Sequence, residues 1–389
     1  MNLTSRLIEY LYFIILAFFV FFGYTVIPQY KIQSIILIAV SIFMFIIFKI
    51  KKIRFNTSTV PWLLIFVLSI LSLSYSISVE KSINYILILV GLLISKIFLD
   101  SCDKNDNKIP TNVFYLFSFI HVIATIIYLI FPELIQTIDK NILTNKGYTY
   151  NVNLYRYGCY AGICSDHGAN AIFISIFLAI AIEKVFNKSS IKNVLMVILG
   201  IIALFLTGKR GYLIACTIAL IITFIYYNKD NRQLIKKFLL IVSLASILVV
   251  ILNTIPATSF VFERFVALSD EGNMLNGRED MYKKLLQNIS RNPFLGNGIN
   301  TTTIINNGND GHNIYLQIFS ELGILGFLLL LYLILANLIL IFKTKNYAKT
   351  SSLFFQIFFI ISGITGNPLY YIPTLVVYNV VTSKYYIEK

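Results

Sequence analysis

Four basic side chains of the sequence carry chemistry that suits a phosphate-bearing substrate. Lys209 and Arg210 occupy LTGKRGYL, a tight turn between two apolar runs, and Arg278 stands in NGRED. His312 follows a loop rich in Asn and Gly and begins GHNIYLQIFSELGILG. An arginine fork holds phosphate through two parallel hydrogen bonds, a lysine adds a point charge, and a neutral histidine accepts a proton from a hydroxyl. These residue types indicate transfer chemistry on an anionic substrate.

The same cations also have structural interpretations, which the sequence leaves open. Lys209 and Arg210 could instead be anchors that reach lipid headgroups from the membrane boundary. Arg278 precedes a helix predicted over 279–289, so its guanidinium and the helix N-terminus could face one anion. Lys283 and Lys284 are expected on the water-facing side of that helix, and its apolar side is expected to lie on the membrane surface.

Further polar residues lie near the same ends of the apolar runs. His167, beside Asp166 where a run begins, is a second candidate for an acid–base role, whereas His121 in mid-run is expected to be structural. The run that His312 begins is about 31 residues long, and we expect it to be one helix whose first turns stand in the outer aqueous layer. On that helix Asn313, Gln317 and Ser320 or Glu321 form a polar stripe. At about 100° per residue, Glu321 lies on the opposite side from His312 and does not orient it.

A membrane-embedded framework must position these residues, because the composition excludes other classes of protein. The chain has 389 residues, of which 57% are hydrophobic and only 13% are charged, so it cannot cover soluble domains with polar surface. It is also neither a disordered chain nor a secreted disulfide scaffold. We predict an all-α polytopic membrane protein with about twelve spans. The spans are expected near 9–27, 32–50, 60–78, 82–99, 111–131, 167–186, 191–207, 211–227, 236–255, 312–342, 350–366 and 370–386.

The net charge of +14 follows from topology and does not require nucleic acid as a partner. Of the 32 Lys and Arg residues, 20 fall at one side of the predicted bundle, Lys96 among them near the end of the span 82–99, and only seven acids, including Asp100, accompany them. The positive-inside rule therefore puts both termini in the cytoplasm. Two long loops, 132–166 and 256–311, face outward, so the active site is expected on the outer side, and the larger loop, 256–311, is expected to carry short helices. We expect residues 1–389 to form a single integral membrane domain.

Several other sites are not supported by the spacing of residues. Gly296 and Gly298 in NPFLGNGIN follow no predicted strand, so they do not indicate a dinucleotide site. No metal-ligand spacing stands out, and we expect no metal and no cofactor. Cys159 and Cys164 share the first outer loop, either as free thiols or as a disulfide.

The motifs that carry a family resemblance are LTGKRG, NGRED followed by NPFLGNG, GHNIYLQIFSELGILG and the closing TGNPLYYIP. Through them the chain resembles the O-antigen ligase and O-antigen or capsule polymerase superfamily. The resemblance is strongest from about 155 to 375. It implies a GT-C-like, all-helical membrane glycosyltransferase whose donor is a polyprenyl-diphosphate-linked oligosaccharide. It also implies that Arg210 and Arg278 hold the diphosphate, that His312 assists the acceptor hydroxyl, and that transfer inverts the anomeric centre without metal. Residues that could contribute to substrate binding are Lys209, Arg156, Arg264, His167, Asn313, Gln317 and Glu321.

Within this superfamily we favour a polymerase of repeat units for O-antigen, capsule or exopolysaccharide, in the bacterial cytoplasmic membrane with its active site on the outer face. Membrane lipid, a chain-length regulator and a flippase are the expected partners. The alternatives are a ligase that transfers finished polymer to another acceptor, and a flippase, which should carry charged groups deep within several spans. A metal-dependent glycosyltransferase of another group needs an acidic pair in the first outer loop, and PQYK contains no carboxylate.

Overall fold

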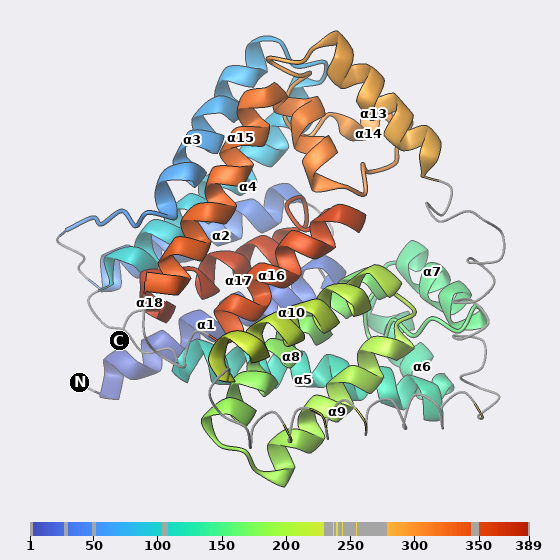
Figure 1. Ribbon diagram of the computed structural model, residues 1–389. Coiled ribbons are helices and arrows are strands. Elements are labelled where there is room, and N and C mark those ends of the chain that lie inside the picture. The colour runs from blue at the N-terminus through green and yellow to red at the C-terminus, as the bar shows by residue number, and fades with distance from the viewer. Residues whose placement is uncertain are drawn as a thin grey trace.

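The structure is a computed structural model, and every regular element that it describes is a helix (Figure 1). It describes residues 3–26, 30–48, 52–102, 108–228, 278–343 and 350–387, with isolated positions at 236, 239, 243 and 254. Most of the expected span 236–255 and the stretch 255–277, which includes Arg264, lie outside the described residues. The prediction of an all-helical chain is confirmed for the described part, and its long apolar helices are consistent with a polytopic membrane protein.

The helices lie close to the predicted apolar runs. Five of those described, α4, α5, α8, α10 and α15, are long and apolar enough to cross a membrane. The number of spans and their direction across the bilayer stay predictions. The main helices are α1 (Leu3–Val26), α2 (Tyr30–Ile47), α3 (Thr59–Leu71), α4 (Val79–Ser101), α5 (Lys108–Ile130), α8 (His167–Asn187), α9 (Ile191–Leu206), α10 (Arg210–Asn228), α15 (Ile314–Lys343), α16 (Thr350–Thr365) and α17 (Ile372–Val381).

Helix α8 is the buried centre of the packing. It contacts α5, α9, α10 and α16, and nearly all of its side chains are buried. Around it, α2 lies along α4 and α10 lies along α16, as Figure 1 shows. A helix that is apolar on every side is typical of such a central position. Because α8 is held from several sides, its first turn is a fixed point for the residues around it.

The first long loop, 132–166, is made of two short helices followed by a tight return. Helix α6 (Pro132–Ile142) begins with a proline, where a missing N–H costs nothing, and α7 (Asn145–Arg156) begins after Thr144, whose hydroxyl accepts from Gly147 N at 3.2 Å. The return ends at Asp166, which caps α8 by accepting a hydrogen bond from Ala169 N at 3.0 Å. These caps fix where α8 starts and so place His167 and Asp166.

The predicted helix in the second long loop is confirmed as α13 (Glu279–Arg291), with Lys283 and Lys284 exposed. The expectation that its apolar side rests on the membrane surface is wrong for Leu285, which is fully buried. Helix α13 packs against α15, and Asn288 donates to the Ser320 hydroxyl at 2.7 Å. Figure 1 shows α13 and the short α14 (Thr302–Ile305) gathered at one end of α15.

The expectation of one continuous helix from His312 is also wrong. Helix α15 begins at Ile314, and it is broken at Gly323, where φ is 64° and ψ is −163°. A side chain at Gly323 would overlap the carbonyl of Phe294, so only glycine fits this close approach. His312 therefore lies before the helix, and angles counted along a helix from His312 to Glu321 do not apply.

The segment 293–298 supplies the hydrogen bonds that the break in α15 removes. Asn297 N donates to the carbonyls of Ser320 at 3.1 Å and Glu321 at 3.0 Å, and Gly298 N donates to the Glu321 carbonyl at 2.8 Å. Ile324 N, which lost its helical partner, donates to the Pro293 carbonyl at 2.8 Å. Buried backbone groups need such partners. The glycine-rich NPFLGNG motif is thus a brace for a kinked helix.

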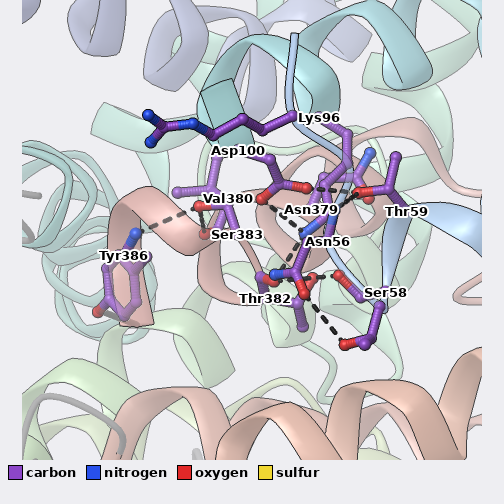
Figure 2. Close-up of polar contacts among 12 residues, drawn as sticks. Asn56, Ser58, Thr59, Lys96, Asp100, Asn379, Val380, Thr382, Ser383 and Tyr386 are labelled. Atoms are coloured by element: carbon purple, nitrogen blue, oxygen red, sulfur yellow. Dashed lines mark hydrogen bonds and ion pairs between the residues drawn. The ribbon is translucent and has the colours of Figure 1, made fainter. Parts of the chain in front are cut away.

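A second buried polar cluster joins α4 to the end of the chain. Lys96, within the predicted span 82–99, and Asp100, expected just after it, are both fully buried in α4, with Lys96 Nζ 3.6 Å from Asp100 Oδ1. Figure 2 shows that Lys96 also donates to the Thr382 carbonyl at 2.6 Å, while Thr59 donates to Asp100 at 2.5 Å. Thr382 lies between α17 and α18 (Lys384–Ile387), where the backbone leaves the helix. The ion pair therefore satisfies a carbonyl that the helix no longer uses.

Candidate functional site

A cavity of about 820 Å³ opens where the ends of several helices meet. Its walls come from α4, α8, α10 and α13, from the loop that precedes α15, and from the turn that follows α16. The charged residues that line it are Lys81, Asp166, Lys209, Arg210, Arg278 and Asp310. Four cations face two carboxylates, so the lining favours an anionic ligand.

Lys209 and Arg210 reach the cavity from the turn between α9 and α10. Gly208 makes this turn with φ of 68°, a conformation that suits glycine, and Arg210 is the first residue of α10. The Lys209 side chain passes over Gly168 in the first turn of α8, because a Cβ added to Gly168 would come within 3.0 Å of Lys209 Cε. The LTGKRG motif thus brings its two cations against the start of α8.

Arg278 comes to the same cavity from far along the chain. It is the residue before α13, and its Nη1 donates to the Thr365 carbonyl at 2.9 Å. Thr365 is the last residue of α16, and its carbonyl is one that a helix end leaves without a helical partner. This bond orients the guanidinium while the side chain stays partly exposed in the cavity lining, so a ligand can still reach it.

His312 lies between Gly311 and the start of α15, half-buried in the cavity lining. Its φ is 48°, which is rare for a residue with a side chain, and its carbonyl accepts from the Tyr282 hydroxyl at 3.4 Å. Burial lowers the pKa of His312, the cations Arg278 and Lys209 lower it as well, and Asp166 opposes them, so that the pKa falls to about 4. The imidazole is therefore neutral at pH 7 and is able to accept a proton.

His167 lines the cavity as well, in the first turn of α8. Its Nδ1 lies 3.0 Å from the Thr207 carbonyl, and its Nε2 lies 3.9 Å from Asp166 Oδ1. The first contact ties α8 to the turn that carries Lys209 and Arg210. His167 thus holds two walls of the cavity together, in addition to lining it.

The polar stripe expected on α15 does not line the cavity. Asn313 caps the helix, with Oδ1 accepting from Tyr315 N and Leu316 N at 3.0 Å each. Gln317 is buried, accepts from Gly311 N at 3.1 Å and donates to Glu321 at 3.1 Å. These residues act on the loop before α15 and not on the cavity contents.

Glu321 is fully buried and holds the loop that follows the brace. Its carboxylate accepts from the backbone N–H groups of Asn300 at 2.6 Å and Thr302 at 3.0 Å, and from the Tyr370 hydroxyl at 2.5 Å. Asn300 and Tyr370 line the cavity themselves. Glu321 therefore positions cavity residues from outside, which is a structural role.

One further candidate from the sequence, Arg156, is not brought to the site. Arg156 is exposed at the end of α7 and is not among the residues that line the cavity. Arg264 lies outside the described residues. The two cysteines of the first outer loop, Cys159 and Cys164, are buried free thiols, and Cys164 Sγ lies 3.3 Å from Nδ1 of the buried His121.

The cavity contains functional candidates that the sequence did not single out. Lys81, Asn84 and Tyr85 line it from the first turns of α4, Asp310 from the loop before α15, and Asn367 from the turn after α16. Two signals could have found some of them. Asp310 stands two residues before His312, and Asn367 lies within the TGNPLYYIP motif.

Asp310 is the carboxylate at the side of the cavity where Lys81 lies. Although its side chain is exposed, the surrounding protein removes part of its water and raises the pKa of the carboxyl, while Asn367 and Lys81 act in the opposite direction. The Lys81 amine donates to the Thr303 hydroxyl, and the Asn300 amide donates to the Lys81 carbonyl at 3.1 Å. This side of the cavity therefore holds a positive charge, a negative charge and neutral polar groups, in contrast to the cationic side around Arg210.

A comparison with known families agrees with this geometry. Residues 195–331 match the family model described as O-antigen ligase. The matched stretch includes Arg210, Arg278 and His312, and it supports the O-antigen ligase and polymerase superfamily for this chain, a group of membrane enzymes of polysaccharide biosynthesis. No curated protein matches the chain significantly.

Proposed function

We propose that this protein joins polyprenyl-diphosphate-linked oligosaccharide repeat units into O-antigen, capsule or exopolysaccharide on the outer face of the bacterial cytoplasmic membrane. The observation that carries the proposal is that Arg210, Arg278 and His312, which are far apart in the sequence, line one cavity. The O-antigen ligase match over 195–331 supports the enzyme class. A lipid-linked anion and a sugar hydroxyl are the two reactants that such a cavity suits.

The two arginines act on the donor. In the transfer, the bond between the anomeric carbon and the diphosphate oxygen breaks, and negative charge grows on the leaving diphosphate. Arg210 and Arg278 offset this charge through bidentate hydrogen bonds, and Lys209 adds a third positive charge close by. Because Arg278 is already oriented by the Thr365 carbonyl, it needs little rearrangement during the reaction.

His312 acts on the acceptor. Its neutral imidazole takes the proton from the attacking sugar hydroxyl as the oxygen bonds to the anomeric carbon. Direct displacement inverts the configuration at that carbon, and the proton then passes from His312 to solvent. Burial and the neighbouring positive charges lower the pKa of His312 and keep it neutral in the free enzyme, so the base is ready before the substrate binds.

The test replaces His312 in two ways. The φ of 48° suits asparagine better than alanine, so His312→Asn preserves the backbone while His312→Ala removes the ring. We expect both variants to reach the membrane and to leave single repeat units unextended. Polymer of normal length from His312→Asn cells would remove the histidine from the mechanism.

A ligase is the second candidate, because the matched family is described as O-antigen ligase. The two functions differ in what accumulates when the protein is lost. Cells without a polymerase hold single lipid-linked repeats, and cells without a ligase hold long polymer on the carrier lipid. A flippase would instead move the lipid-linked repeat across vesicle membranes with no new glycosidic bond.

A further inference from the structure

We infer that Asn84, Asp310 and Asn367 form the subsite that binds the sugar of the acceptor. This inference rests on the proposed function, and it assigns a part of the cavity that the diphosphate does not use. The three residues come from different elements: α4, the loop before α15 and the turn after α16. Asp310 is two residues from His312, a distance along the chain of at most about 7 Å. A sugar held by Asp310 therefore lies within reach of the proposed base.

Two amide oxygens at this side of the cavity lack hydrogen-bond donors. Asn84 Oδ1 and Asn367 Oδ1 are both shielded from solvent, and neither has a partner within the part of the chain that the structure describes. Buried polar atoms in folded proteins are normally paired, so an orphaned pair in one cavity indicates a ligand that brings donors. Sugar hydroxyls both donate and accept, and they match an amide pair beside a carboxylate.

Two tyrosine rings complete the subsite. Tyr85 and Tyr370 line the same cavity, with ring centroids 5.1 Å apart and planes inclined by 31°. Their hydroxyls are already used, because Tyr85 donates to the Leu369 carbonyl at 2.7 Å and Tyr370 donates to Glu321. The fixed rings therefore offer flat apolar surface, which suits the C–H faces of a sugar ring.

The charge distribution separates this subsite from the diphosphate site. The Asp310 carboxylate would repel a phosphate placed against it, whereas Lys209, Arg210 and Arg278 supply positive charge, and Asp166, the other carboxylate among the described lining residues, caps α8. The same carboxylate disfavours an acidic sugar. The expected acceptor residue, at the non-reducing end of the repeat unit, is therefore a neutral or amino sugar.

The test measures two ligands separately on the purified full-length protein in lipid nanodiscs. One probe is the oligosaccharide released by mild acid from lipid-linked repeats, which carries neither lipid nor diphosphate, and the other is undecaprenyl diphosphate. Calorimetry should show that Asn84→Ala, Asp310→Ala and Asn367→Ala each raise the Kd of the oligosaccharide about tenfold. The Kd of undecaprenyl diphosphate should stay within about twofold.

Matched variants make the result interpretable. Asn309→Ala removes an exposed amide from the same loop outside the cavity lining, and it should change neither Kd. Arg210→Ala should give the reverse pattern, with weaker undecaprenyl diphosphate and unchanged oligosaccharide. If the alanine variant of Asn84 or Asp310 does not fold, Asn84→Asp or Asp310→Asn takes its place in the assay, because these changes keep the side-chain volume.

The outcomes distinguish the two levels of inference. An oligosaccharide Kd that is the same in the wild type and the subsite variants, or no oligosaccharide binding at all, would overturn the acceptor subsite. Undecaprenyl diphosphate that fails to bind, or that binds Arg210→Ala as well as the wild type, would overturn the proposed function instead. A uronic acid at the non-reducing end of the repeat would contradict the neutral or amino sugar.

Discussion

The fall of activity at low pH, the acid limb of the pH profile, is a direct test of the lowered pKa of His312. Because the pKa of His312 is lowered to about 4, the imidazole stays neutral well below the usual pKa of a histidine. At pH 5 a histidine with the ordinary pKa of about 6.5 would be only about 3% neutral, whereas one with a pKa of about 4 is about 90% neutral. If neutral His312 is required, these two cases differ about 30-fold in rate at pH 5.

The prediction applies to kcat/KM for the donor, which reports the free enzyme. We expect kcat/KM to stay within about twofold of its plateau from pH 7 to pH 5 and to reach half of the plateau near pH 4. The limb in kcat should lie at higher pH. Bound diphosphate offsets the charges of Arg278 and Lys209, and this allows the pKa of His312 to rise.

The assay is chain extension by proteoliposomes over short incubations, each followed by a return to pH 7 to show that the loss is reversible. Lys209→Gln removes a cation that lowers the pKa of His312, so the limb should move to higher pH, whatever happens to the plateau. Lys283→Gln removes an exposed charge of α13 and should not move it. A wild-type limb near pH 6.5, or a limb that Lys209→Gln leaves in place, would refute the reasoning.

Three further predictions concern the diphosphate site and the framework. Arg210→Lys should lower donor kcat/KM by about 10- to 100-fold although the charge is kept, since the bidentate fork is lost, while Arg291→Lys at the exposed end of α13 should be neutral in the same assay. Gly323→Ala should lower the Tm measured by size-exclusion of the heated protein, because the methyl group overlaps the brace; an unchanged Tm would contradict the close approach. Lys96→Met should cost about 3–5 kcal/mol of the free energy of unfolding in detergent titrations, by removing the ammonium group beside the buried Asp100 carboxylate. Lys96→Met combined with Asp100→Leu should recover much of that loss, and a double variant no more stable than the single one would argue against the pair.

The sequence predicts the helices well because hydropathy is a local property. The predicted run 111–131 corresponds to α5 (Lys108–Ile130), and 191–207 corresponds to α9 (Ile191–Leu206). The helix predicted over 279–289 forms as α13 because its apolar spacing and the Asn-Pro that follows it are both readable from neighbouring residues.

The break in α15 could not be predicted in the same way. An apolar run of this length gives no sign of it, because the hydrogen bonds that make the kink tolerable come from Pro293, Asn297 and Gly298. The buried charge of Asp100 was missed for the same reason, since Thr59 and Lys96 complete its partners only in the folded chain. Pairing across the fold decides both cases.

The residues of the candidate site could be predicted from the sequence only in part. Arg210, Arg278 and His312 could be selected from residue type and position, because Arg210 and His312 stand at the ends of apolar runs and Arg278 directly precedes a predicted helix. Asn84 could not, and Asn367 only through its motif, since an amide beside an apolar run is ordinary until the structure shows that its oxygen has no partner among the described residues. The residues proposed to act on charge are thus easier to find than those proposed to recognise sugar.

The brace over 293–298 limits where this chain can gain or lose residues. Both ends of the brace are hydrogen-bonded to the backbone of α15, one to Ile324 and the other to Glu321. Glu321 in turn sets the position of Asn300. An insertion within the brace would shift every later residue up to His312 out of step with the helix. Gly308 has open space around it, so extra residues at that turn would extend outward. Natural length variation and engineered tags should therefore be tolerated at the turn and rejected in the brace.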